Sequence, residues 1–125
     1  MKQMTIFLKE VLRLYPPGSD NELKVAKSDH TITDGRRKYW IPKGTRIKLG
    51  IYGTQINPKW WPDPYEFKPE RFLNNEFHPY AWLAFSAGPK VCLGKNFALL
   101  IGKLCLIEFL NSFDIEKFEK PKGFV

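Results

Sequence analysis

The chain has 125 residues, 43% of them hydrophobic, which is enough for one modest core and excludes a simple disordered polymer. Its net charge of +7 could attract nucleic acid, an anionic membrane or an acidic protein, but the basic residues are dispersed, with Arg36-Arg37-Lys38 the longest run. The two cysteines stand outside any CxxC and far from His30 and His78, which excludes a disulfide framework and disfavours structural zinc. A reducing compartment suits this cysteine usage better than a secreted one.

The first half of the chain changes from helical to strand-like periodicity. Residues 1–15 carry apolar side chains at helical spacing, and Pro16-Pro17 follow, so this segment predicts a helix. Residues 18–52 contain short β-like runs separated by turn signals, which predict one small sheet. The expected runs are residues 23–26, 31–32, 39–41 and 46–52, the last with Ile47, Leu49 and Ile51 on one face.

The second half combines an irregular segment with a long helix. Residues 53–84 are rich in proline and aromatic residues and predict an extended meander, in which Asn57 caps one helical turn between Pro58 and Pro62. After a loop at 85–94, residues 93–110 predict a long, largely buried helix. Charged and polar residues interrupt its apolar stretch, so it does not resemble a transmembrane helix, and no segment resembles a signal peptide.

The loop FSAGPKVCLG, residues 85–94, carries the candidate chemistry. Cys92 stands just before the long helix, where backbone N–H groups and the positive end of the helix dipole stabilise a thiolate. Lys90 adds positive charge, and Phe85 can shield a sulfur ligand from water. Gly88 permits a sharp turn, and Gly94 lets a flat, bulky partner approach the first helical turn.

The same loop also has a less specific interpretation, in which Cys92 is not a ligand. Most lone cysteines are inert and buried, and each glycine could be an ordinary turn residue. The combined pattern F-x-x-G-x-K-x-C-x-G is much more specific, because average residue frequencies make a chance match in this length rarer than roughly one in ten thousand. The pattern therefore favours a ligand thiolate, an interpretation that fails if Cys92 lies deep among aliphatic side chains without a cavity beside it.

This loop resembles the cysteine-ligand signature of the cytochrome P450 superfamily, in which the cysteine is the axial thiolate of a b-type haem. The resemblance implies that Cys92 is the catalytic iron ligand and that Lys90 and Lys24 each pair with a haem propionate. Lys90 replaces the commoner arginine and loses its bidentate fork. The other residues that the resemblance assigns to the haem site are Phe85, Gly88, Gly94 and Ala98.

Two further motifs resemble the same family. Glu10-x-x-Arg13, followed by Tyr15-Pro16-Pro17, is similar to the helix K signature, although by itself it could be an ordinary exposed ion pair. Residues 67–72, FKPERF, are similar to the meander motif, whose arginine is Arg71. The resemblance implies that Glu10, Arg13 and Arg71 form one buried structural cluster that supports the haem loop.

The resemblance covers nearly the whole chain, with departures. Residues 78–81, HPYA, resemble the animal family-four branch, which includes fatty-acid ω-hydroxylases, and His78 is then expected to fix the meander rather than bind metal. The polar stretch 18–22, where the substrate pocket is expected, argues against a fatty-acid substrate. The other departures are Ile101 in place of a frequent glutamate, and Gln55-Ile56 in place of His-Arg before Asn-Pro.

The resemblance implies an α+β fold, mainly α in the full-length protein. The parts would be helix K at 1–15, a small sheet at 18–52, a meander at 53–84, the cysteine loop at 85–94 and helix L at 93–110. Complete members are several times longer, and the oxygen-handling helix I, the membrane anchor and the final hairpin have no counterpart in this sequence. The isolated chain is therefore expected to have little or no monooxygenase activity.

The function that this resemblance implies is insertion of one oxygen atom from O2 into a lipophilic organic substrate. NADPH would supply electrons through a flavoprotein reductase whose acidic face meets Lys90 and Lys95, unless these lysines only solvate a helix end. The full-length protein would lie at the endoplasmic-reticulum membrane, on its cytosolic face. One alternative is a truncated, non-catalytic haem-binding or scaffold protein. Another, a basic nucleic-acid module, explains none of the three motifs.

Overall fold

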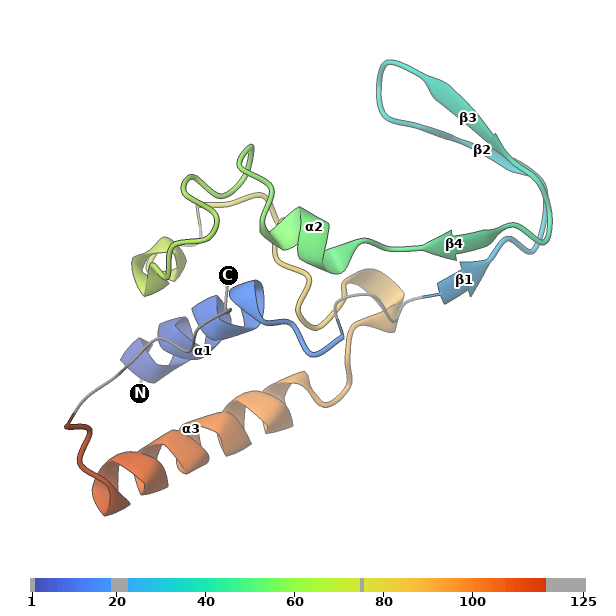
Figure 1. The fold of residues 1–125 in the computed structure, drawn as a ribbon. Helices are drawn as coiled ribbons and strands as arrows, with labels where there is room; N and C mark the ends of the chain where they lie inside the picture. Colours follow the sequence, from blue (N-terminus) through green and yellow to red (C-terminus); the bar gives the residue numbers. More distant parts are fainter. Residues whose placement is uncertain (1, 19–22, 75, 117–125) are drawn as a thin grey trace.

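The computed structural model describes residues 2–18, 23–74 and 76–116, so most of the polar stretch 18–22 lies outside the described residues. Helices and antiparallel strands occupy separate parts of the chain, which confirms the α+β fold class (Figure 1). In chain order the elements are α1 (Lys2–Leu14), β1 (Leu23–Val25), β2 (His30–Thr33), β3 (Lys38–Ile41), β4 (Arg46–Lys48), α2 (Ile51–Gln55), the 3-10 turns η1 (Pro69–Phe72) and η2 (Gly88–Lys90), and α3 (Lys95–Ser112).

Helix α1 is the centre of the packing, because it contacts η1, α2 and α3. Its buried face combines apolar Ile6 and Leu14 with the charged side chains of Glu10 and Arg13. The N–H of Tyr15 still donates to the carbonyl of Val11, at 2.8 Å, and the proline at position 16 has no N–H with which to continue. The helix therefore ends where its sequence predicts.

The strands form two separate two-stranded antiparallel sheets rather than the single small sheet that the sequence predicted. Strand β1 pairs with β4, with Lys24 opposite Ile47, and β2 pairs with β3, with Thr31 opposite Trp40. The β2–β3 hairpin extends away from the helices (Figure 1). At its tip, the carboxylate of Asp34 accepts hydrogen bonds from two backbone N–H groups, which closes the turn.

The expected strand 46–52 is wrong in its second half. Strand β4 stops at Lys48, and α2 begins at Ile51, with the N–H of Thr54 donating to the carbonyl of Gly50 at 3.1 Å. Ile51 is buried as a helical residue, and Leu49 remains exposed. Alternating apolar residues at 47, 49 and 51 suit a strand locally, but the burial of Ile51 in the helical conformation overrides that local preference.

The meander is held together by aromatic packing. The carbonyl of Asn57 accepts from the N–H groups of Trp60 and Trp61, both at 3.0 Å, so one turn forms at the predicted place. Trp61 is 1% exposed, and its indole N–H donates to the carbonyl of Ala81 at 3.2 Å. This residue anchors the apolar core, whose other members are Ile6, Phe72 and Ala81, with Phe77 and Trp82 packed against them.

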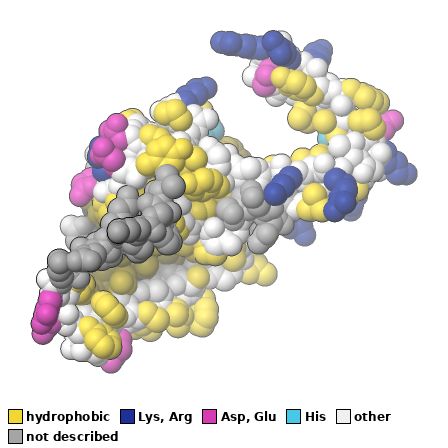
Figure 2. Space-filling model, in the orientation of Figure 1, with side chains coloured by type: hydrophobic (Ala, Val, Ile, Leu, Met, Phe, Trp, Pro, Cys, Tyr) yellow, Lys and Arg dark blue, Asp and Glu magenta, His cyan; other side chains and the backbone are white. Residues whose placement is uncertain are grey.

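The expectation that residues 93–110 form a largely buried helix is wrong about burial. Helix α3 forms there, but within the described part of the structure none of its residues is buried. Its contact with α1 is close at Gly102, where a Cβ atom would lie 3.2 Å from Cδ1 of Leu8. Apolar residues surround the rest of the helix, so one neighbouring helix cannot cover them all. Figure 2 shows hydrophobic side chains along its outer side. Within the described residues, no helix combines the length and hydropathy needed to cross a bilayer.

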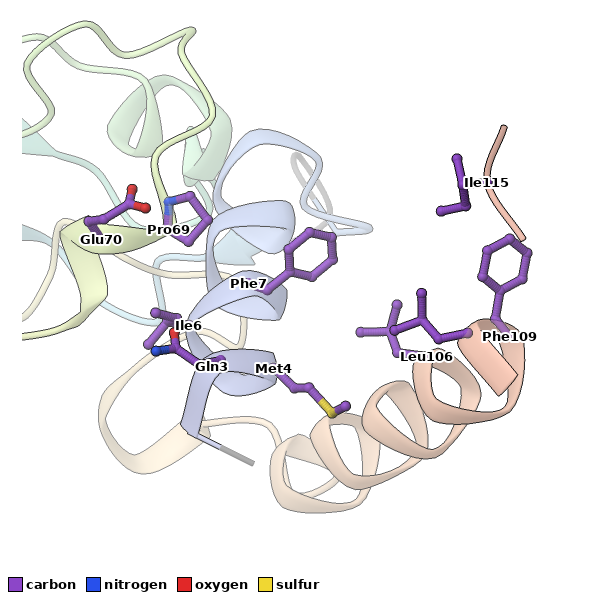
Figure 3. A pocket seen from close by; sticks show the side chains of 10 residues that line it. Gln3, Met4, Ile6, Phe7, Pro69, Glu70, Leu106, Phe109 and Ile115 are labelled. Atoms are coloured by element: carbon purple, nitrogen blue, oxygen red, sulfur yellow. The ribbon is translucent and has the colours of Figure 1, made fainter. Parts of the chain in front are cut away.

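A hollow of about 560 Å³ lies between α1 and the far half of α3, away from the cysteine loop. Figure 3 shows Met4 and Phe7 of α1 facing Leu106 and Phe109 of α3 across it. Among the described residues that line it, Glu70 is the only charged one and none is a histidine or a cysteine. The hollow is therefore a packing gap between two apolar helix faces and a poor candidate for the chemical site.

Two neighbouring tryptophans provide a matched test of the meander core. We expect Trp61→Ala to lower the free energy of unfolding of the whole protein by about 3–5 kcal/mol, because it empties a buried site. Trp60 is 36% exposed and contacts His78, so Trp60→Ala should cost only about 1 kcal/mol. Urea denaturation followed by circular dichroism measures both. Equal losses would contradict this placement of the core.

Candidate functional site

Cys92 lies in an accessible position at the approach to α3. Its side chain is exposed and not in a disulfide, and its backbone N–H donates to the carbonyl of Phe85 at 2.9 Å. Its carbonyl accepts from the N–H of Lys95, the first residue of α3, at 3.3 Å. The sulfur is therefore near the positive end of the helix, and it is not among the buried side chains.

The backbone of the cysteine loop is sharply bent. Gly88 has φ of +69°, a left-handed conformation that glycine adopts without steric cost, and it begins the short turn η2. Ser86 has φ of +60°, which sequence reasoning missed, because serine is not a typical residue for that conformation. At Gly94, a Cβ would lie 3.8 Å from the sulfur of Cys92, an ordinary contact distance.

Two adjoining hollows surround the exposed side of this loop. One, of about 360 Å³, is lined by Phe85, Lys90 and Cys92. The other, of about 410 Å³, is lined by Lys24 and Lys90, and both hollows share Ile51, Leu83 and Ser86. Lys90 lines both hollows, whereas Lys24 lines only the one that Cys92 does not reach. Ala98 lines a different hollow, between α1 and α3, together with Phe85.

Glu10 and Arg13 form a fully buried ion pair, which excludes the alternative of an ordinary exposed pair. Nε and Nη2 of Arg13 donate to the two carboxylate oxygens of Glu10 at 2.7 and 2.9 Å, and both residues are 0% exposed. The other N–H groups of the guanidinium donate to three backbone carbonyls. They belong to Gln55 at 2.9 Å, Pro64 at 2.7 Å and Glu66 at 3.2 Å.

Arg71 joins this cluster more loosely than the sequence suggested. Its Nε lies 3.4 Å from Glu10 Oε1 but makes no hydrogen bond, although it is buried. That carboxylate oxygen instead accepts from the backbone N–H of Lys68 at 2.8 Å. The guanidinium of Arg71 donates through Nη2 to the carbonyl of Asp63, also at 2.8 Å. Arg71 therefore contributes charge to the buried pair and a hydrogen bond to the meander.

Exposed charges secure the meander beside this cluster. The ammonium of Lys68 lies 2.9 Å from Asp63 and 2.6 Å from Glu66. The hydrogen bond and charge of Lys68 lower the pKa of Asp63, and the two acids raise the pKa of Lys68. Because a lowered carboxyl pKa stabilises the fold above the unfolded pKa, this contribution is lost as the pH falls through the folded pKa of Asp63.

Trp82 connects the entry of the loop to α1. Its indole N–H donates to the carbonyl of Lys9 at 3.1 Å. The ammonium groups of Lys9 and Lys95 lie 5.9 and 5.7 Å from its ring centre. Burial, and then the charge of Lys95, lowers the pKa of Lys9. Lys95 is therefore partly engaged at the start of α3 and is not a purely solvated helix end.

Gln55 is a buried polar residue that sequence analysis noted only as a departure from the family pattern. It is 0% exposed, and its side chain bonds to backbone groups at the end of α1 and at Leu83. Ile51 and Gln55 stand at the two ends of the short helix α2, four residues apart and therefore on one face. A prediction of a helix at α2 would have placed Gln55 on the same face as the apolar Ile51 and so indicated that its side chain is buried.

A sequence model described as cytochrome P450 matches residues 1–123, nearly the whole chain. The chain belongs to the cytochrome P450 family.

The curated relatives are longer proteins. The chain is 36% identical to cytochrome P450 3A13 of Mus musculus over 93% of its own length and 23% of the relative. It is 38% identical to cytochrome P450 3A18 of Rattus norvegicus, over 98% of this chain and 24% of that protein. It thus spans about a quarter of the curated relatives that it matches. The names of these relatives belong to the 3A group, so the comparisons do not confirm the family-four resemblance.

Membership of the cytochrome P450 family implies a haem cofactor, and the described residues can accommodate one. Thiolate-ligated members bind the haem iron through a cysteine, and the haem carries two anionic propionates. Here an exposed thiol and Lys90 line one hollow, and Lys24 lines the adjoining one. One sulfur donor and two amines around connected space match the chemistry of that cofactor.

The buried ion pair predicts a large effect of a small substitution. Glu10→Gln keeps the side-chain volume but leaves the guanidinium of Arg13 as an uncompensated buried charge. We expect the whole protein to lose about 3–5 kcal/mol of unfolding free energy. Glu70→Gln, an exposed change next to Arg71, is the control and should stay within about 0.5 kcal/mol. Similar denaturation midpoints for both variants would mean that the pair does not stabilise the fold.

Proposed function

We propose that this chain is the haem-binding part of a monooxygenase that inserts one oxygen atom from O2 into a lipophilic organic substrate. The observation that carries the proposal is the exposed sulfur of Cys92 at the start of α3, beside a hollow that Lys90 also lines. In family terms α1 corresponds to helix K, residues 53–84 to the meander and α3 to helix L. All of them belong to one cytochrome P450 domain that includes residues 1–125.

Cys92 is the proposed iron ligand because its surroundings favour an anionic sulfur. The first N–H groups of α3 have no partners within the helix, and they direct partial positive charge toward the residues before it. Lys90 and Lys95 add formal positive charge on either side of Cys92. When bound, the haem supplies the iron that activates O2, and a thiolate ligand donates electron density that favours O–O cleavage.

The other residues of the loop have supporting roles in this proposal. Phe85, whose carbonyl accepts from the N–H of Cys92, lines the same hollow as the sulfur and would limit the access of water to a bound iron–sulfur pair. Lys24 and Lys90 neutralise the two propionates from the hollow that they share. Gly88 permits the left-handed turn, and Gly94 leaves the approach to the first turn of α3 free of a side chain. Ala98 presents only a methyl group on α3 beside Phe85.

Electron delivery and location follow from the same assignment. Electrons would come from NADPH through a flavoprotein reductase, whose acidic face would meet the positively charged side of the loop at Lys90 and Lys95. The whole protein would act at the endoplasmic-reticulum membrane, on the cytosolic face. Haem binding by the whole protein without product formation from any lipophilic substrate would instead support a non-catalytic haem-binding scaffold.

The two cysteines allow a direct test of the iron ligand. Both are exposed, and Cys105 lies on α3 away from the loop. We expect Cys92→Ser to abolish the Soret band that marks thiolate ligation in the reduced, CO-bound whole protein, because serine cannot replace the thiolate. Cys105→Ser should keep the band unchanged. Loss of the band only in the Cys105 variant would disprove the assignment.

The lysine at position 90 predicts a graded effect on haem retention. Lys90→Ala should speed haem loss from the whole protein about tenfold, because a charge-assisted contact to a propionate disappears. Lys90→Arg should match or exceed the parent, since a guanidinium can form a bidentate contact. Lys43→Ala, in the exposed loop before β4, is the control. Transfer of haem to an excess of apomyoglobin measures the rates, and identical rates in all variants would argue against this role.

A further inference from the structure

The side chain of Gln55 bridges two segments that are distant in sequence. Its Nε2 donates to the carbonyls of Leu12 and Arg13 at 3.1 and 3.0 Å, and its Oε1 accepts from the N–H of Leu83 at 2.8 Å. Carbonyl oxygens can only accept and a backbone N–H can only donate, so these partners fix which way the amide points. All three bonds are made by a residue that is 0% exposed.

Both segments matter for the cysteine loop. Leu12 and Arg13 belong to the last turn of α1, and Arg13 is the basic partner of the buried ion pair. The carbonyl of Gln55 itself accepts from Arg13 Nη1 at 2.9 Å. On the other side, the carbonyl of Leu83 accepts from the N–H of Ser86 at 2.8 Å. Two residues after Leu83, the carbonyl of Phe85 receives the N–H of Cys92. Gln55 is thus connected to both the ionic cluster and the loop.

We propose that Gln55 is a positioning residue, whose amide fixes the Leu83–Cys92 loop on the end of α1 and thereby sets the place of the Cys92 sulfur. The role assigned to that sulfur rests on the proposed function. The position of the Leu83 N–H rests on the hydrogen bonds alone. A buried backbone N–H that loses its acceptor is costly, so the loop has one strongly preferred arrangement while the amide is present.

The chemistry of the amide determines which substitutions preserve this role. An ionised Glu at position 55 can still accept from Leu83, but it faces the carbonyls of Leu12 and Arg13 without a proton to donate. Those carbonyls lie at the negative end of α1, so the charge is repelled as well. A neutral His has one donor and one acceptor, and it can keep one contact on each side. We therefore expect the loop to be held most firmly with Gln at position 55, less firmly with His and least firmly with Glu.

The test uses the whole protein with Gln55→Glu and Gln55→His, and with Gln3→Glu as the control because Gln3 is exposed on α1. Hydrogen exchange of the Leu83 amide reports the bridge, and the reduced, CO-bound Soret band reports the fraction of haem with a thiolate rather than a thiol ligand. Both are measured where circular dichroism shows the variants folded. Leu83 should exchange about tenfold faster in the Glu variant, with a clear loss of the thiolate fraction.

The His variant should lie between the parent and the Glu variant in both measurements, and Gln3→Glu should match the parent. Unchanged exchange of Leu83 in both Gln55 variants would overturn the bridge. Faster exchange with a full thiolate fraction would overturn its role in placing the sulfur. Absence of the thiolate band in the parent protein would instead reject the proposed function, and with it the consequence for the sulfur, while the exchange rates still decide the bridge.

Discussion

The buried ion pair of Glu10 and Arg13 is the interaction on which the rest of this structure depends. Removing two charges from water is expensive, and the pair is favourable only because its remaining hydrogen-bonding groups are satisfied. Arg13 uses them on carbonyls of α2 and of the meander at positions 55, 64 and 66. These contacts hold a segment with little regular secondary structure against α1. The side chain of Arg13 thus supplies hydrogen bonds to backbone carbonyls that have no partner strand.

The cysteine loop takes its position from the same helix. Gln55 joins the end of α1 to Leu83, and the indole of Trp82 bonds to the carbonyl of Lys9. The loop that follows bends through two left-handed residues, Ser86 and Gly88, before it reaches Cys92. A left-handed serine costs conformational free energy, and such a residue persists only where its surroundings over-determine the backbone. The attachments at Leu83 and Trp82 provide that constraint.

The features that the sequence predicted best are those determined by residues close together in the chain. The stripe of α1 and the order of Phe85, Gly88, Lys90 and Cys92 are local patterns, so α1 and the cysteine loop were identified without long-range information. Glu10 and Arg71 are separated by about half of the chain, and only resemblance to a family suggested that they meet. Gln55 was missed because the alternation from position 47 to 51 favoured a strand, which hid α2 and its buried face. Long-range burial overrode the local pattern there.

Helix α3 shows why hydropathy alone did not predict burial. Its apolar residues lie on every side, so its sequence indicates a buried helix, yet within the described residues α1 covers only the side at Gly102. This contact with α1 still matters for the site. Together with the position of Lys95 beside Trp82, it fixes the direction of the helix axis and hence where the positive end of the dipole points. The other faces of α3 are exposed within the described residues, so its direction relative to Cys92 is set by the side that meets α1 and by Lys95.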